Sequence, residues 1–307
     1  MNVRQIEIFE ALMRTGSVSA AARALNLSQP AVTKSLRLAE QSAGFTLFRR
    51  VRGRLFPSRE AESLLPGVKK VRDDLDAIAR RIHQLKHGSA GTVTIASVAS
   101  LTHALLTPVV ARFARERPDI RIEVTSLPSR MVVETVANSQ ADLGLIHDPS
   151  DNLYVDGDDL CQAEVVCVVP RKHALARRRS LGAADLQQES LITFRADTPL
   201  GAAVRRALSD ANVTPDIHIV VNQSQHAINL VEAGAGVALI DPFLMIHGGH
   251  STVVPITLRP GIPLRPRIIR ARDRPHSRAA LQFSRETRAV VAELARTSPF
   301  LVRAGQR

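Results

Sequence analysis

The sequence contains only two cysteines, Cys161 and Cys167, among its 307 residues. Two cysteines cannot build the disulfide framework of a small secreted domain, and without a CxxC pair they do not indicate a zinc site. No apolar run reaches the roughly 18 residues that a membrane-spanning helix needs. The first residues also lack the apolar core of a signal peptide. We therefore expect a cytoplasmic protein that holds no metal.

The short motifs of common enzyme classes are also missing. The sequence has no GxSxG turn, no phosphate-binding loop, no GxGxxG after a predicted strand and no HExxH helix. Gly234-Ala235-Gly236 lacks the remaining positions of a dinucleotide-binding fingerprint. The sequence therefore predicts a protein that is not an enzyme and that carries no cofactor.

Positive charge is abundant and unevenly distributed. The formal net charge is +12, which favours nucleic acid or another anionic surface as a partner. Residues 1–59 contain ten Lys or Arg and three acids, a net charge of +7. A solvated basic surface would have the same composition, so charge alone leaves both interpretations open.

Three short helices are predicted at residues 3–14, 18–25 and 29–42 from the spacing of apolar residues. Ser28 can cap the third helix, and Pro30 suits its first turn, where a missing N–H costs nothing. Two helices joined by so short a turn are typical of a helix-turn-helix, whose second helix enters the DNA major groove. The residues expected to contact DNA there are Ser28, Gln29, Pro30, Thr33, Lys34 and Arg37.

These DNA-contacting residues have different chemistry. Gln29 can hydrogen-bond adenine through two atoms, and Thr33 offers a hydroxyl or a methyl to thymine. Lys34 and Arg37 suit phosphate, which positions the helix without reading sequence. An ordinary helical hairpin with a polar face is the alternative interpretation.

A basic turn follows the three helices. Two short apolar runs, Phe45–Phe48 and Leu55–Pro57, flank the turn, which indicates a β-hairpin wing. Arginines crowded on a small surface repel one another. A DNA phosphate backbone neutralises their charge, and the release of its condensed counterions favours binding. The wing arginines expected to contact DNA are Arg50, Arg52 and Arg54.

Residues 58–87 are predicted to form one longer helix with a narrow apolar stripe. The stripe is spaced alternately by three and four residues, which is the period of a coiled-coil seam, and charges occupy the other positions. Pairing with a second copy of the chain is the favoured interpretation, and an intramolecular core is the alternative. The stripe consists of Val68, Val71, Leu75, Ile78, Ile82 and Leu85.

Beyond a Gly- and Ser-containing linker, strands alternate with helices, which indicates a mostly parallel sheet with crossover helices. Ligands of such sheets bind at the carboxyl ends of the strands. We expect three parts: a winged helix-turn-helix at 1–59, a linker helix at 60–90, and an effector-binding domain at 91–307. Within the last part we expect subdomain I at 91–162 and 267–307 and subdomain II at 163–266.

The chain resembles the LysR-type transcriptional regulators over nearly its whole length. The resemblance rests on Ser17-Val18-Ser19-Ala20-Ala21-Ala22, Leu27 to Thr33, Leu38-Ala39-Glu40, Leu47-Phe48, Pro57-Ser58, Ala141 to Gly144, Val169-Pro170 and Val231 to Val237. It implies a two-subdomain α/β effector domain similar to periplasmic binding proteins, with a ligand cleft between the subdomains. It also implies a tetramer of paired dimers, a double-stranded DNA site with dyad symmetry, effector-dependent DNA bending and RNA polymerase as a further partner.

The same resemblance places candidate effector-binding residues at strand ends and helix starts. They are Ser100, Leu101, Ser129, His147, Phe194, Asn222 and Ser224. Helix caps and solvated loop residues are the alternative roles. Asp241-Pro242-Phe243 looks similar to regulators that sense opines and basic amino acids. We therefore expect a small effector that is anionic or amino-acid-like.

A redox sensor on the same scaffold is the alternative function, with Cys161 and Cys167 as the switch. A redox switch needs an accessible thiolate of low pKa. Cys167 lies inside the apolar run Val165–Val169, which favours a buried structural role instead.

Overall fold

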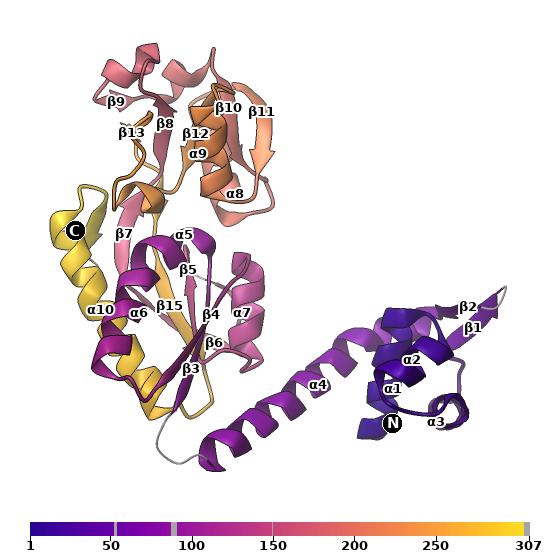
Figure 1. Ribbon diagram of the computed structural model, residues 1–307. Helices are drawn as coiled ribbons and strands as arrows, with labels where there is room; N and C mark the ends of the chain where they lie inside the picture. Colours follow the sequence, from indigo (N-terminus) through magenta and orange to yellow (C-terminus); the bar gives the residue numbers. More distant parts are fainter. Residues whose placement is uncertain (52–53, 87–90, 149, 304–307) are drawn as a thin grey trace. The chain divides into compact units, whose positions relative to one another are not determined.

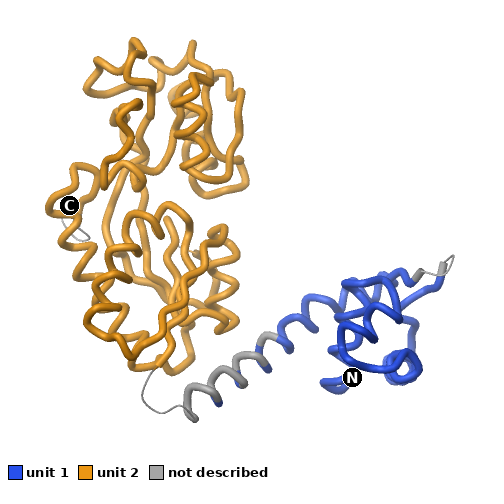
Figure 2. Tube along the Cα trace, viewed as in Figure 1, with its two compact units in different colours: residues 1–86 blue, residues 87–307 orange. Residues whose placement is uncertain are grey.

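The computed structural model describes residues 1–51, 54–86, 91–148 and 150–303 (Figure 1). For residues 51 and 54, for several positions between 73 and 86, and for residue 303, only the backbone is described. The chain divides into two compact units, Met1–Lys86 and His87–Arg307 (Figure 2).

The first unit contains three short helices, a hairpin and one long helix. Its helices begin where the sequence provides caps: the Oγ atoms of Ser17 and Ser28 accept hydrogen bonds from the amides of Ala20 and Ala31. The bounds are α1 Val3–Thr15, α2 Val18–Ala24, α3 Gln29–Ala43, β1 Phe48–Val51, β2 Arg54–Pro57 and α4 Arg59–Lys86. β1 and β2 pair antiparallel, as expected of a wing.

A small core holds these elements together. Phe9 and Leu12 of α1, Val32 of α3 and Leu47 beside the hairpin are almost fully buried. Val68 of α4 belongs to the same core at 8% exposure, which corrects its expected place on a free seam. The first turns of α4 are therefore part of the head, because their apolar face packs on α1 and β2.

Subdomain I of the second unit is built on a five-stranded sheet of order β4-β3-β5-β15-β6 (Figure 1). Its strands are β3 Thr92–Ser97, β4 Arg121–Ser126, β5 Leu143–Ile146, β6 Val155–Asp159 and β15 Arg267–Ala271. The edge strand β4 is mostly exposed, although its sequence alternates apolar and polar residues as a half-buried strand does. Alternation gives the period of a strand but does not tell whether its inner face is covered.

Helices cover both faces of this sheet. They are α5 Ala99–Leu101, the π-helical η1 Thr102–Leu106, α6 Thr107–Glu116, α7 Ser129–Ala137 and α10 Arg278–Thr297. The helical segment after β3 begins at Ala99. α7 packs closely on the sheet at Gly144, where a Cβ atom would lie 2.9 Å from side-chain carbons of Val132 and Val136.

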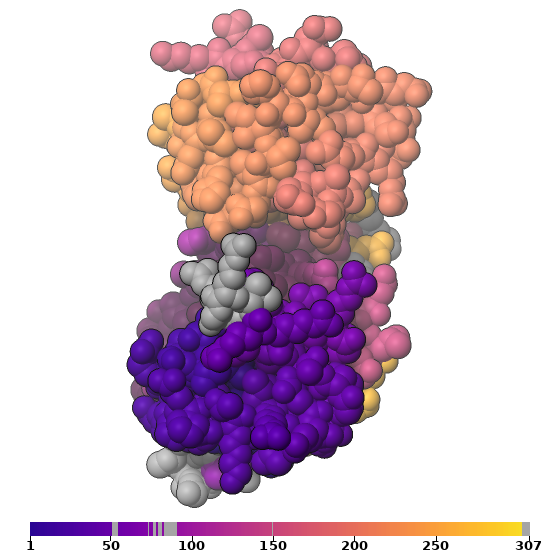
Figure 3. Space-filling model, turned by 90° about the vertical axis from the view of Figure 1, so that its right-hand side faces the viewer, coloured from indigo at the N-terminus to yellow at the C-terminus, as the bar shows by residue number. Residues whose placement is uncertain are grey.

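Subdomain II is built on a six-stranded sheet of order β11-β10-β12-β8-β13-β9. Its strands are β8 Val166–Pro170, β9 Ser180–Leu181, β10 Ser190–Phe194, β11 Asp216–Val221, β12 Val237–Ile240 and β13 Val253–Leu258. Its helices are η2 Ala174–Arg177, η3 Ala183–Leu186, α8 Pro199–Asp210, α9 Ser224–Glu232 and η4 Phe243–Met245. The orange surface in Figure 3 includes the edge of this sheet that ends in β11.

A three-stranded sheet of order β14-β7-β16 connects the two subdomains. It consists of β7 Cys161–Glu164, β14 Pro263–Leu264 and β16 Leu301–Arg303. The chain passes from subdomain I to subdomain II and returns at neighbouring points, because the amide of Val165 donates a 2.9 Å hydrogen bond to the carbonyl of Ile262. Among the described helices, none combines the length and apolar character that crossing a bilayer requires.

Candidate functional site

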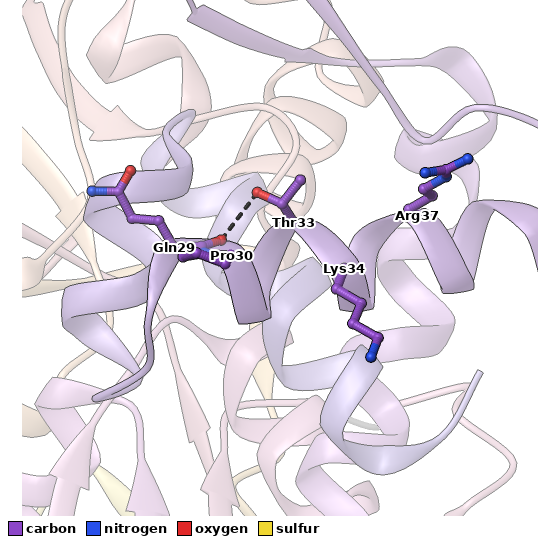
Figure 4. A pocket seen from close by; sticks show the side chains of 5 residues that line it. All are labelled: Gln29, Pro30, Thr33, Lys34 and Arg37. Carbon is purple, nitrogen blue, oxygen red and sulfur yellow. Dashed lines mark hydrogen bonds between the residues drawn. The ribbon is translucent and has the colours of Figure 1, made fainter.

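The start of α3 presents an open hollow on the surface of the first unit (Figure 4). Five of the six residues predicted to contact DNA from this helix line it: Gln29, Pro30, Thr33, Lys34 and Arg37. All five are exposed, and so is Ser28, which caps the helix. The opposite face of the helix is anchored, because Val32 and Ala39 are buried in the core. The helix therefore turns its donors and acceptors outward on a fixed support.

One hydrogen bond within the hollow changes the chemistry expected of Thr33. The Thr33 hydroxyl donates to the carbonyl oxygen of Gln29 at 3.0 Å, as the dashed line in Figure 4 marks. Its proton is therefore engaged within the helix, which leaves the methyl group and an oxygen lone pair for a partner. The Gln29 side chain makes no hydrogen bond within the described part of the chain, so its amide keeps both donor and acceptor.

The base of the wing is tied to the other end of α3. Oε1 of Glu40 accepts hydrogen bonds from the amides of Leu47 and Phe48, at 2.7 and 3.2 Å. The arginine side chains of β1, Arg49 and Arg50, are exposed beyond this anchor. Arg52 lies outside the described residues; Arg54 lies in β2, but its side chain is not described.

A second group of polar side chains meets between the subdomains of the second unit. Ser100 starts the helical segment after β3, and its Oγ lies 3.0 Å from Nε2 of His147, which follows β5. The same Nε2 lies 3.7 Å from Oδ2 of Asp241, which follows β12 of the other subdomain. Ser224, at the start of α9, donates a 2.5 Å hydrogen bond to that oxygen. These four residues therefore form a chain of polar contacts between the two subdomains, where the resemblance predicts a ligand cleft, and we call it the cross-cleft chain.

Asp241 is the deepest member of the cross-cleft chain. The residue is 1% exposed, and its other oxygen accepts a 3.3 Å hydrogen bond from the amide of Phe243. The rings of Phe243 and His147 stack with centroids 5.4 Å apart. Nδ1 of His147 is buried and has no hydrogen-bond partner among the described residues. A buried carboxylate thus lies beside Nε2 of His147, while Nδ1 of the same ring is left unsatisfied.

Two further contacts bridge the same cleft. His247 of subdomain II lies 2.7 Å from the carbonyl oxygen of Ala104, which belongs to the π-helical segment η1. The amide of Arg265 donates to Asp148 at 3.4 Å, and burial raises the pKa of that carboxyl above its ordinary value. The two subdomains therefore contact each other directly in this structure, through polar groups.

The other expected effector residues do not join the cross-cleft chain. Leu101 and Phe194 are buried and belong to the hydrophobic core. Ser129 is half-buried and Asn222 is exposed, and neither hydrogen-bonds to the four residues. Sequence reasoning missed the role of Asp241, although its place directly after the buried run of β12 is a strand-end signal.

The expected dimerisation stripe is apolar and largely uncovered within one chain. Val71, Ile78 and Ile82 are 43%, 56% and 49% exposed, and Leu75 is half-buried. The side chain of Leu85 lies outside the described residues. A row of exposed aliphatic side chains on a helix is unfavourable in water.

Both cysteines are buried. Burial raises the pKa of Cys161 to about 12, and burial also raises the pKa of Cys167. The thiolate, which is the reactive form, is therefore disfavoured at both positions. No group of three or more His, Cys, Asp or Glu in the described part of the chain is placed to hold a metal ion.

Comparisons with known proteins agree along the whole chain. The model of "Bacterial regulatory helix-turn-helix protein, lysR family" matches residues 3–62, and that of "LysR substrate binding domain" matches residues 86–292. The regulatory protein NocR of Agrobacterium fabrum is 28% identical over 280 residues, 91% of this chain and 93% of that protein. The octopine catabolism/uptake operon regulatory protein OccR of Rhizobium meliloti is 30% identical over 85% of each chain.

The fold is also that of a solved regulator bound to DNA. Full-length CbnR complexed with its target DNA matches with a TM-score of 0.72 at 18% identity, over 94% of this chain and 100% of that chain. The matched family regulates transcription by binding DNA and is not a family of enzymes, as the sequence predicted. The resemblance noted from the sequence is thereby confirmed: the chain belongs to the LysR family of DNA-binding transcriptional regulators, with an effector-binding domain after its helix-turn-helix.

Proposed function

We propose that this regulator binds an amino-acid-like effector in the cleft between its subdomains and thereby changes how it engages and bends promoter DNA. The observation that carries the proposal is the cross-cleft chain, in which Ser100 and His147 of subdomain I meet Ser224 and Asp241 of subdomain II. A ligand that replaces these contacts acts on both subdomains at once, so its binding changes their relative position.

The charges of the cleft favour a zwitterion over a simple anion. The carboxylate of Asp241 is buried, and a buried carboxylate is stabilised by a cationic partner. An ammonium group of the effector would pair with Asp241 and relieve its contact with His147. The hydroxyl of Ser100 and the imidazole of His147 would then donate to the effector's carboxylate. OccR, a relative of this chain, is named for octopine catabolism and uptake, which supports a search among amino acids and their derivatives.

On DNA, we propose that α3 reads the major groove and that the wing holds phosphate. Gln29 and Thr33 would contact base edges, with the Thr33 methyl against thymine. Lys34, Arg37 and Arg50 would neutralise phosphates, which adds affinity without sequence preference. The exposed apolar stripe of α4 supports pairing of two chains, and two paired heads fit a DNA site with dyad symmetry. Association of two such dimers into a tetramer completes the proposed assembly.

A thermal-shift screen followed by calorimetry tests the effector proposal. The full chain would be screened against the protein amino acids, their decarboxylated amines and their deaminated acids, because a ligand of the folded state raises the unfolding temperature. We expect a zwitterion to bind and both of its truncated analogues to bind at least about tenfold more weakly, since each loses one charged hydrogen-bond pair. A deaminated acid that binds as tightly as the parent amino acid would contradict the role of Asp241.

Two variants and a control locate the site. Ser100→Ala and Asp241→Asn should weaken the binding of that amino acid about ten- to a hundredfold, whereas Asn222→Ala should bind it normally. Binding to promoter DNA without effector should be retained in all three, because none of them alters the DNA-binding head. Normal effector binding by Ser100→Ala would place the site elsewhere, and loss of DNA binding by the same variant would assign Ser100 a structural role.

A further inference from the structure

The outer side of subdomain I carries a hollow that the cleft does not use. It has a volume of about 250 Å³ and lies between the sheet and α10. We propose that this hollow is a second ligand site that takes a small organic acid, with the carboxylate held by arginine and the carbon chain against an apolar wall. Its lining consists of Leu143, Arg270, His276, Ala280, Leu281, Ser284, Arg285 and Arg288.

The positive charge of this hollow is only partly neutralised. Arg270 and Arg288 both donate 2.6 Å hydrogen bonds to Oδ2 of the same carboxylate, Asp158. Arg285, one turn before Arg288, forms no ion pair with any residue that the structure describes. Three arginines therefore line the hollow, and two of them share the one carboxylate of Asp158. An anion placed there would accept hydrogen bonds from a preformed pair of arginines and from Arg285.

His276 at the mouth adds no charge of its own. Burial and the neighbouring Arg270 lower its pKa below the ordinary value for histidine, while Asp142 and Asp156 act in the opposite direction. The imidazole is therefore neutral at pH 7 and serves as a hydrogen-bonding group. The site thus favours anions through its arginines alone, so its preference for an acid should persist across neutral pH.

The inner wall of the hollow is apolar. Leu143 at the start of β5 and Ala280 of α10 are buried, whereas Leu281 is 46% exposed at the edge. A bare inorganic anion would leave this wall in contact with water, whereas an acid with a short carbon chain would cover it and gain the burial of apolar surface. The small volume limits the ligand to a few carbons, because sites for larger ligands usually exceed about 300 Å³.

The hollow is separate from the cleft. Leu143 begins β5, and His147 directly follows the end of that strand, so the two sites lie at opposite ends of β5, roughly 13 Å apart at 3.3 Å per residue. None of the residues of the cross-cleft chain lines the hollow. The proposal therefore stands independently of the effector proposed for the cleft.

Hexanoate is the probe for this site. Hexanol is the uncharged comparison ligand of the same chain length, and inorganic phosphate is the comparison anion without a carbon chain. Their binding to the full chain would be measured by ligand-observed NMR titration. We expect hexanoate to bind more tightly than hexanol or phosphate. Arg285→Ala should weaken hexanoate about fivefold and Arg285→Glu more strongly, because an exposed charge contact contributes modestly. The control Arg115→Ala removes an exposed arginine of α6 outside the hollow and should leave binding unchanged.

Four outcomes would overturn the proposal. Equal binding of hexanol and hexanoate would remove the role of the arginines, and equal binding of phosphate and hexanoate would remove that of the apolar wall. Unchanged hexanoate binding by Arg285→Glu would place the probe elsewhere on the protein. Loss of hexanoate binding by Ser100→Ala would assign the probe to the cleft, and it would likewise contradict the proposal.

Discussion

Ser224 and Asp241 are joined by a hydrogen bond of 2.5 Å from the serine Oγ to Oδ2 of the carboxylate. Ser224 begins α9 and Asp241 directly follows β12, so the bond fixes the end of a strand against the start of the neighbouring helix. The carboxylate is thereby held in one orientation within subdomain II, with the same oxygen 3.7 Å from His147 of subdomain I. Subdomain II thus holds the carboxyl group of Asp241 in a fixed position beside His147.

Gln29→Ala should reduce binding to the specific promoter site and leave binding to random DNA nearly unchanged. The lost pair of hydrogen bonds to one base should cost about 1–3 kcal/mol on the specific site. Fluorescence anisotropy with both DNAs measures the two affinities. Gln41→Ala, an exposed glutamine near the other end of α3, is the matched control and should bind as the wild type does. Equal losses on both DNAs would sink the assignment of Gln29 as a base reader.

Arg50→Ala should weaken binding to every DNA sequence by a similar factor. Each phosphate contact contributes counterion release, so the slope of log affinity against log salt should fall by roughly one unit. The measurement is a salt titration of affinity on specific and on random DNA. An unchanged salt slope would show that the exposed wing arginine does not contact phosphate.

Ile78→Asp combined with Ile82→Asp should abolish pairing through α4. Two carboxylates in an apolar seam would be buried without partners, which is strongly unfavourable. Sedimentation velocity should record a smaller species, and cooperative binding to a paired DNA site should be lost. Lys69→Asp changes an exposed residue of α4 outside the stripe and should sediment as the wild type does. A double variant of wild-type size would show that other surfaces hold the oligomer.

Asp158→Asn should reduce the dependence of the free energy of unfolding of the second unit on pH in the acidic range. Hydrogen bonds from Arg270 and Arg288 lower the pKa of Asp158. A carboxyl with a lowered folded-state pKa stabilises the fold above its unfolded pKa of about 4. That contribution is lost as the pH falls through the folded-state pKa.

Urea unfolding at a series of pH values from 7 to about 3 measures this effect. Its size should be small, because the Asp158 side chain is 41% exposed and therefore screened by solvent. Asp210→Asn, an exposed carboxyl at the end of α8, is the control and should keep the wild-type profile. Identical profiles for the wild type and Asp158→Asn would contradict the assignment.

The two thiols should be unreactive in the folded protein. Because burial raises the pKa of Cys161 to about 12 and also raises that of Cys167, little thiolate forms at pH 8. A thiol-specific chromogenic reagent should label neither cysteine rapidly until urea is added, and peroxide should leave promoter binding unchanged. Rapid labelling of the native protein, with a parallel change in DNA binding, would support the redox alternative.

The start of α3 and its exposed face could be predicted from the sequence because their signals are local. Ser28 and Pro30 mark the start of α3, and the five residues that line its hollow all follow from helical spacing and exposure. In the effector domain, the strand-end rule indicated which segments lie at the ends of the strands but not the direction of each side chain. Leu101 and Phe194 turn into the core for that reason, whereas Ser100 and Ser224 meet the cleft.

The contact that Asp241 makes could not be predicted from the sequence, for a different reason. Its contact with His147 depends on how two subdomains pack against each other, and no sequence spacing encodes that arrangement. Val68 is a similar case: its spacing fits the seam of α4, but the first turns of that helix pack on α1. In both cases the sequence indicates the kind of residue, and only tertiary packing decides what it contacts.

The position of β15 also dictates an order of events during synthesis on the ribosome. β15 lies between β5 and β6 in the sheet of subdomain I, yet it follows the whole of subdomain II in the chain. Until residue 271 has emerged, β5 and β6 each lack a neighbour and their unpaired backbone groups are open to other strands. The nascent chain therefore completes its second subdomain before its first, and the unfinished sheet is the segment that chaperones have most reason to shield.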